Sequence, residues 1–293
     1  MTMTVTAQYT SAAADGSGSS GGGGVASPQS ATTTVHPVCW YEQDKTGADL
    51  AQEIDSYDSQ FVKEWLGRKY DGYEDHAGDA DGHWYTPTCD YRYYRGDKPG
   101  EFRAFTQIWM LTASAMWVPA GGVPPEPVID GATLARAAWD AVTIPTATIG
   151  YNPSVGDVGA TIVGMDTWVW ATGDTPKEVT VTATAGSTTA TITATASMLT
   201  LQPDDGTAKC TGFGIPWTEE NDAKGTDCKI IFNRSSAHFK NSVTPVDIKV
   251  SYAITYTATD GATGTMDTHT TSTTTTIPVA EIQTLNTQPT KQP

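Results

Sequence analysis

The C-terminal half of the chain alternates between small apolar residues and threonine with a period of two. In 179–185 the apolar residues fall on odd positions, and after the Gly186-Ser187 pair they fall on even positions in 190–196. Such alternation is typical of a strand with one buried face, and a change of parity across Gly-Ser is typical of a hairpin. A longer run over 246–256 keeps its apolar and aromatic residues on one parity. These patterns predict a β-sandwich over 161–285.

Helical spacing occurs nearer the N-terminus. Apolar residues three or four positions apart predict one amphipathic helix that stops at Gly67, with a buried stripe of Leu50, Ile54, Tyr57, Phe61 and Trp65. A second, short helix is expected to begin after Asp130, which can cap it, and to end before Pro145. The apolar and aromatic segment 103–117 favours a pair of strands.

Composition divides the rest of the chain. Residues 1–35 are mostly Gly, Ser, Thr and Ala, which predicts a flexible, disordered tether with its most flexible point at Gly21–Gly24. Residues 36–125 are rich in aromatic side chains and predict a small α+β module, whereas 126–160 combines the short helix with proline-rich connectors. The polar end, 286–293, predicts a frayed tail. The expected fold class is therefore mainly β.

The chain is strongly acidic. Its 17 Lys and Arg residues against 33 Asp and Glu residues give a net charge of −16. Because an acidic surface repels phosphate backbones, nucleic acid is excluded as a partner. The sequence contains no run of about 18 apolar residues, so we expect no membrane insertion.

Four cysteines without a C-x-x-C pair indicate two disulfides rather than a metal cluster: Cys39, Cys89, Cys210 and Cys228. Three pairings are possible. We favour Cys39–Cys89 with Cys210–Cys228, because each bridge then stays within one compositional half of the chain. Disulfides indicate an oxidising compartment and therefore a secreted or cell-surface protein. The N-terminus lacks the basic and apolar regions of a signal peptide, so we expect that a signal has been removed.

Several segments carry a resemblance to a known family: 127–130 (PVID) with 134–138 (LARAA), 162–165 (IVGM) with 168–170 (WVW), 210–217 (CTGFGIPW) and 277–283 (IPVAEIQ). The chain resembles secreted proteins of actinobacteria such as Streptomyces that have a C-terminal PKD-like, immunoglobulin-like β-sandwich. The resemblance covers 37–285 and implies a place at the cell envelope, but no particular biochemical activity. Residues 201–206 replace the tryptophan-containing turn that is usual in PKD modules. Some family members carry a nucleotide-binding label, but this sequence has no phosphate-binding G-x-x-x-x-G-K-[ST] motif.

Candidate chemistry is sparse. No G-x-S-x-G motif or other nucleophile–base arrangement occurs, so we expect no enzyme activity, no catalytic residues and no cofactor. Clustered carboxylates with glycine form a weak candidate calcium site: Asp71, Glu74, Asp75, Asp79 and Asp81. The alternative is a solvated acidic loop, because the spacing departs from that of an EF-hand.

Aromatic density in 36–125 is the strongest binding signal. Trp, Tyr and Arg are frequent anchors of interfaces, and the candidate binding residues are Trp84, Tyr85, Tyr91, Tyr93 and Tyr94. The alternative is that these rings form the core of a small module. We expect a non-enzymatic structural or interaction protein of the actinobacterial envelope that binds a protein partner or assembles with itself. A carbohydrate-binding module and a pilus or filament subunit are the other hypotheses.

Overall fold

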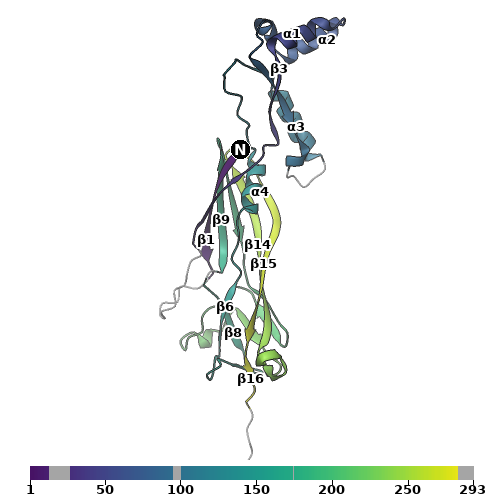
Figure 1. The fold of residues 1–293 in the computed structure, drawn as a ribbon. Coiled ribbons are helices and arrows are strands. Elements are labelled where there is room, and N and C mark those ends of the chain that lie inside the picture. Colours follow the sequence, from purple (N-terminus) through teal and green to yellow (C-terminus); the bar gives the residue numbers. More distant parts are fainter. Residues whose placement is uncertain (13–26, 95–99, 174, 283–293) are drawn as a thin grey trace, which may run out of the picture.

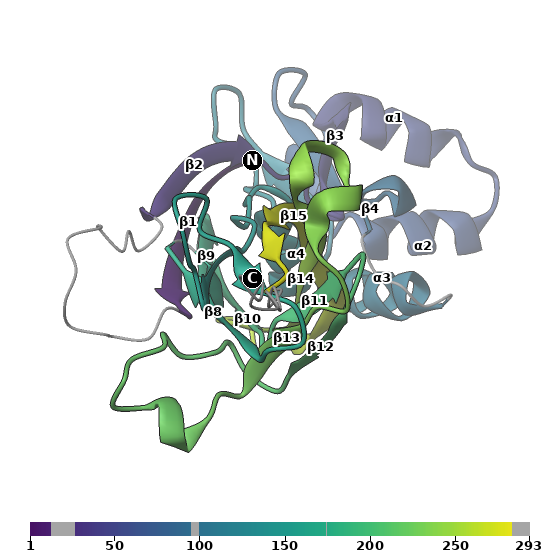
Figure 2. The same cartoon turned by 90° about the horizontal axis from the view of Figure 1, so that it is seen from below.

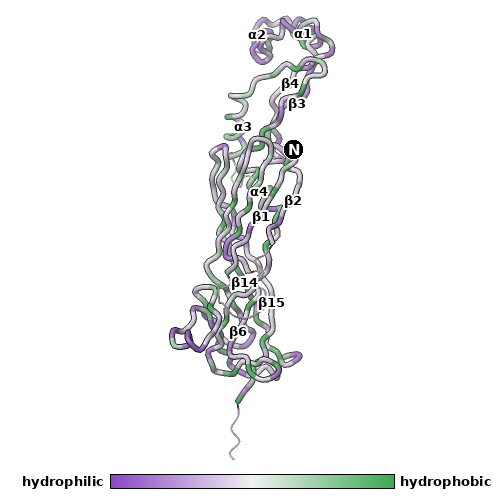
Figure 3. The backbone as a smooth tube through the Cα atoms, turned by 90° about the vertical axis from the view of Figure 1, so that its left-hand side faces the viewer, coloured by the Kyte–Doolittle hydropathy of each residue, from purple (hydrophilic) through white to green (hydrophobic). Residues whose placement is uncertain are grey.

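The computed structural model describes residues 1–12, 27–94, 100–173 and 175–282. Within them, an elongated body carries a smaller head at one end, and Figures 1 and 3 show this shape from two sides. Residues 36–125 form the head, as a single excursion of the chain between two parts of the body. The predicted mainly β class is confirmed. The finer prediction of a PKD-like or immunoglobulin-like sandwich stays a prediction.

The principal sheet of the body is curled and has seven strands: β1 (Thr2–Ser11), β2 (Gln29–Thr34), β9 (Pro176–Ala185), β10 (Thr188–Thr195), β11 (Thr200–Pro203), β14 (Thr244–Ala258) and β15 (Thr263–Ile277). On one side β14 pairs with β10 and β11, and on the other it pairs with β15 along almost its whole length. Among the described strands, β2 pairs only with β1, and β11 and β15 pair only with β14, so these three strands form the edges of the sheet.

The predicted threonine hairpin is confirmed as β9 and β10. The two strands are antiparallel, and their register runs from Thr188 opposite Ala185 to Thr195 opposite Glu178. Apolar residues of both strands point inward, so that Val181 and Ile192 are fully buried. The long run over 246–256 lies in β14 and alternates between buried and exposed residues as predicted.

The prediction of a flexible tether over 1–35 is wrong for two segments, β1 and β2, because both form strands of the principal sheet. β1 lies inside the sheet, and its side chains alternate between exposed threonines and buried Met3, Val5 and Ala7, each 1 % exposed. The period-two pattern of β1 is the same as that of β9, its partner. Burial against β9 supplies the apolar contacts that a free Thr-rich segment lacks. Gly21–Gly24 and the predicted tail 286–293 lie outside the described residues.

A second sheet lies at the far end of the body and has four strands: β6 (Thr148–Asn152), β8 (Thr167–Thr172), β12 (Thr207–Cys210) and β13 (Cys228–Ile231). β6 lies within 126–160, where the sequence predicts only the short helix and proline-rich connectors, and it pairs with β8. A short parallel pair joins β7 (Thr161–Ile162) to β16 (Val279–Ala280). Both sheets contribute to one hydrophobic core, with Val169 and Phe232 from this end.

The head contains three strands, β3 (Cys39–Thr46), β4 (His83–Cys89) and β5 (Met116–Val118), and three helices, α1 (Gly47–Ser56), α2 (Gln60–Lys69) and α3 (Glu101–Thr112). The described residues also include five short 3₁₀ helices: Tyr73–His76, Tyr91–Tyr93, Asp222–Lys224, Ser236–His238 and Lys240–Ser242.

Two sequence predictions in the head are wrong. The single helix is two helices that meet at 57–59, and Gly67 lies inside the second one. Leu50 and Ile54 of the predicted stripe are buried. Because of the break between the helices, Phe61 and Trp65 are exposed instead. The strand pair expected over 103–117 is the helix α3 followed by the short strand β5.

Both predicted disulfides are confirmed. Cys39 is bonded to Cys89 and Cys210 to Cys228. Each bridge joins residues directly opposite each other on paired strands, β3 with β4 and β12 with β13. The first closes a loop of 50 residues in the head, and the second closes one of 18 residues in the body. Each bridge therefore restricts the unfolded chain of a different part of the molecule.

The helix predicted after Asp130 is confirmed as α4 (Gly131–Asp140). The Asp130 carboxylate accepts a hydrogen bond of 2.8 Å from the Thr133 amide, as an N-cap does. The helix buries Leu134 and Ala138 inside the curl of the principal sheet (Figure 2). At its start, the Gly131 amide donates to the Asp260 carboxylate in the turn between β14 and β15, at 2.7 Å.

Replacing Gly131 with alanine should loosen this contact. A Cβ atom at residue 131 would lie 2.2 Å from the Cβ of Ala258 and 2.5 Å from an Asp260 carboxylate oxygen. We expect a loss of unfolding free energy of about 1–3 kcal/mol from overpacking, measured by guanidinium denaturation. Gly78→Ala is the matched control, because a Cβ there has no neighbour within 4 Å. Equal stability of the two variants would contradict the close approach.

Candidate interaction surface on the head

The predicted binding residue Trp84 belongs to the core of the head. Its side chain is 2 % exposed and packs with Leu50, Ile54, Leu66 and Tyr70. β4 lies between β3 and β5, so this residue is in the centre of the small sheet. Trp84 therefore lies where the alternative of a core ring places it, and a binding role for this residue stays a prediction.

The other four predicted residues lie nearer the surface but differ in their contacts. The Tyr85 hydroxyl donates to the Gln43 side-chain oxygen at 3.3 Å. The Tyr93 ring stacks on the His36 ring, with centroids 3.7 Å apart, so its face is occupied. Tyr91 is 70 % exposed and is the most accessible of the five predicted residues.

The calcium site considered for the acidic loop stays a prediction. Among the described residues, no three acidic, histidine or cysteine side chains gather as metal ligands. The Asp79 carboxylate instead accepts hydrogen bonds of 2.9 Å from the amides of Asp81 and Gly82. These bonds favour its charged form and lower the pKa of Asp79. The carboxylates at Asp71, Glu74 and Asp75 lie around the first 3₁₀ helix.

α3 is fixed to the head by one aromatic face. Phe102, Phe105 and Trp109 follow a spacing of three and four residues, so they share one side of the helix. Phe102 packs edge-on against Tyr91 and Tyr94, with ring centroids 5.3 and 5.5 Å apart. The Trp109 ring contacts Tyr41 at 5.9 Å. Two of the predicted binding residues, Tyr91 and Tyr94, are thus brought together, and they support α3.

The side of α3 that is open to solvent carries three large apolar side chains next to the exposed polar residues Arg103 and Gln107. Ile108, Met110 and Leu111 are 67, 54 and 80 % exposed. We call these three residues the α3 surface. Large aliphatic side chains with this exposure are unusual when several occur on one turn, and contiguous apolar patches mark sites of association. On α2, Phe61 and Trp65 are also exposed, at 77 and 56 %.

Sequence reasoning missed the α3 surface because it assigned this segment to strands. The helical signal was present in the spacing of Phe102, Phe105 and Trp109. The high density of apolar residues concealed it, because large apolar side chains occur outside the supporting face of this helix as well as on it.

No family model matches the chain, and comparisons with curated proteins and with solved structures find no similar protein. The resemblance to secreted actinobacterial proteins therefore stays a prediction. The described part of the chain contains no helix long and apolar enough to cross a membrane.

Proposed function

We propose that this chain is a secreted or cell-surface, non-enzymatic interaction protein of an actinobacterial envelope that binds a protein partner through the α3 surface. The exposure of Ile108 and Leu111 on a helix held by rings on its other side is the observation that carries the proposal. The two disulfides support an oxidising compartment. The head lies at one end of the elongated body, where its surface is accessible to a partner (Figure 1).

The chemistry of the α3 surface favours a protein over a glycan. Its side chains are aliphatic or a thioether and offer no strong hydrogen-bond donor or acceptor. A sugar has many hydroxyl groups, which would lose water without gaining partners there. An apolar protein surface has no such cost, and burying each large side chain contributes about 1.5–3 kcal/mol.

Assembly into a filament is a second candidate function. Strand β15 is fifteen residues long and pairs with β14 alone among the described strands. Its segment 270–277 is rich in threonine and has no charged residue or proline. Exposed edges without such protection are templates for pairing with another chain. Light scattering of the purified protein would reveal such an assembly as a mass above that of one chain.

Binding to the cell envelope tests the proposed function. We expect labelled full-length chain to bind envelope preparations from the source cells saturably. We expect the variant Ile108→Ser with Leu111→Ser to bind at least about tenfold more weakly, because it loses apolar burial at both positions. The matched control is Val155→Ser with Val158→Ser, which replaces two exposed valines of the body.

Treatment of the envelope distinguishes the partner classes. Prior digestion with protease should abolish binding, whereas prior digestion with glycan hydrolases should not. Binding that survives protease and is lost after glycan digestion would replace the protein partner with a carbohydrate. Equal binding by the α3 variant and the valine control would overturn the α3 surface as the contact.

A further inference from the structure

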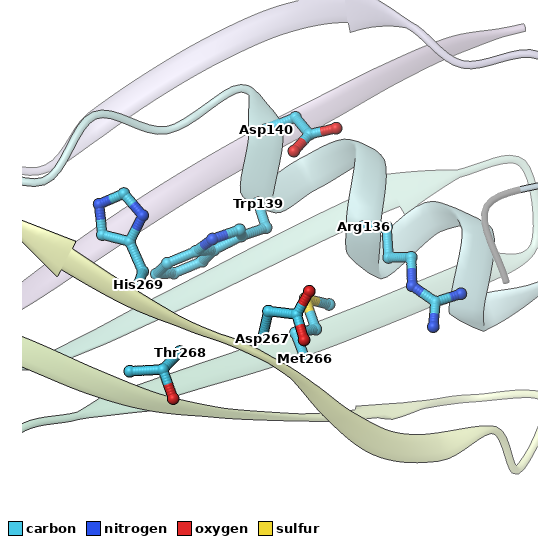
Figure 4. Close-up of a pocket in the computed structure, with 7 residues that line it drawn as sticks. All are labelled: Arg136, Trp139, Asp140, Met266, Asp267, Thr268 and His269. Atoms are coloured by element: carbon cyan, nitrogen blue, oxygen red, sulfur yellow. The ribbon is translucent and has the colours of Figure 1, made fainter. Parts of the chain in front are cut away.

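A pocket of about 340 Å³ lies in the body between α4 and the edge strand β15. α4 contributes Arg136 and Trp139, and β15 contributes Met266, Asp267 and His269 (Figure 4). Thr268 and Asp140 complete the lining. The pocket is part of the body, so it is separate from the α3 surface of the head.

A β-bulge shapes the strand side of the pocket. Tyr252 of β14 lies opposite His269, and Ile254 lies opposite Met266. Between these pairs β14 advances by two residues and β15 by three, so one extra residue is accommodated at 267–268. Bulges turn side chains out of the regular alternation and are frequent next to binding sites. Here the bulge occurs at the segment of β15 that lines the pocket.

The helix side of the pocket is held in place by the rest of the fold. Arg136 and Trp139 are three residues apart, so they share one face of α4. The Trp139 indole is half-buried against the body core and meets the His269 ring edge to face, with centroids 5.8 Å apart and planes at 82°. α4 itself is fixed by its buried face and by the bond from the Gly131 amide to Asp260. A ring fixed in this way loses little conformational entropy when a ligand binds.

The side chains in the pocket have the chemistry that a sugar requires. Each sugar hydroxyl both donates and accepts hydrogen bonds. Arg136 can only donate, an ionised Asp267 can only accept, and His269 can do either. The indole of Trp139 offers an apolar, electron-rich surface to the C–H groups of a pyranose ring. One arginine against two aspartates, Asp140 and Asp267, leaves a local charge of about −1 with neutral histidine, which does not favour an anionic ligand.

We propose that this pocket binds one or two pyranose rings of a neutral glycan. Its volume is at the lower end of the range for small-ligand sites, about 300–1,000 Å³, and suits a mono- or disaccharide more than a longer buried chain. Trp139 supplies the platform, and Arg136, Asp267 and His269 bind the hydroxyl groups. This site adds a carbohydrate contact to a chain whose proposed protein contact lies on the head.

Saturation-transfer NMR on the full-length chain tests the site. The probes are cellobiose, maltose, lactose, mannobiose, xylobiose and chitobiose, each at up to about 20 mM, because single small sites bind sugars weakly. We expect at least one probe to bind, with its ring C–H protons closest to the protein. Trp139→Ala should weaken that binding at least about tenfold, and Asp267→Ala should weaken it at least about fivefold. Asp267 is exposed on an edge strand, so its replacement leaves folding unaffected.

Trp65→Ala is the matched control, because it removes an exposed tryptophan of the head. It should bind the probe as the unaltered chain does. Failure of every probe to bind, or binding that survives both pocket substitutions, would overturn the proposal. Loss of binding in Trp65→Ala alone would place the sugar contact on the head instead. The variant Ile108→Ser with Leu111→Ser should keep its sugar binding, so the two proposals can fail separately.

Discussion

Val5→Asp should unfold the body of the protein, whereas Thr4→Asp should leave it folded. Val5 is 1 % exposed in the core of the principal sheet, and Thr4 on the opposite face is exposed. An aspartate at position 5 would place an unpaired carboxylate among Val181 and other buried apolar residues of the same core. We expect a loss of more than about 4 kcal/mol, which is a large part of the total stability of a typical domain, about 5–15 kcal/mol.

Far-UV circular dichroism and guanidinium denaturation of the full-length chain measure this effect. The β-sheet signal should be lost, or its midpoint greatly lowered, only in the Val5 variant. The comparison with Thr4→Asp holds charge and local composition constant and changes only the face of the strand. Two variants that both retain native stability would mean that the first residues are a tether after all.

The strands of the body could be predicted where the period-two pattern was long and the flanking residues resembled turns. β9, β10 and β14 met both conditions. β1 has the same alternation, but it precedes a Gly/Ser-rich segment, and its partner β9 lies more than 160 residues further along the chain. A threonine-rich strand obtains little stability from its own sequence, so its assignment depends on a distant partner that local patterns do not reveal.

The candidate site was harder to predict for a different reason, because composition does not indicate which way a ring points. Trp84 and Tyr85 are adjacent in the sequence, yet Trp84 is buried and Tyr85 is only partly covered. Predicting the α3 surface required the recognition of a helical period over 103–112. Predicting the pocket in the body required knowing that Trp139 and His269 are in contact, and these residues are 130 positions apart in the sequence. The bulge that shapes it involves a one-residue shift in register that the threonine pattern of β15 does not show.

Trp84→Ala should unfold the head and leave the body folded. Among the described residues, the hydrophobic cluster around Trp84 has five buried members, and Trp84 is the largest of them. Its ring meets those of Tyr70 and Trp117 edge to face, at 5.4 and 5.5 Å. Its indole nitrogen has no hydrogen-bond partner, so the substitution removes packing alone, at a cost of about 3–5 kcal/mol. The body has a separate core to which Trp84 does not contribute.

Hydrogen exchange followed by mass spectrometry can resolve the two parts. Peptides from α1 and α2 should lose protection in Trp84→Ala, while peptides from β9 and β10 keep theirs. Trp65→Ala, with the same change at an exposed ring, should preserve protection in both regions. Normal protection of the head in Trp84→Ala, together with weaker binding to the envelope, would restore Trp84 as a binding anchor. Loss of protection in the body as well would show that the head and body fold as one cooperative unit, because their separate cores would then depend on each other.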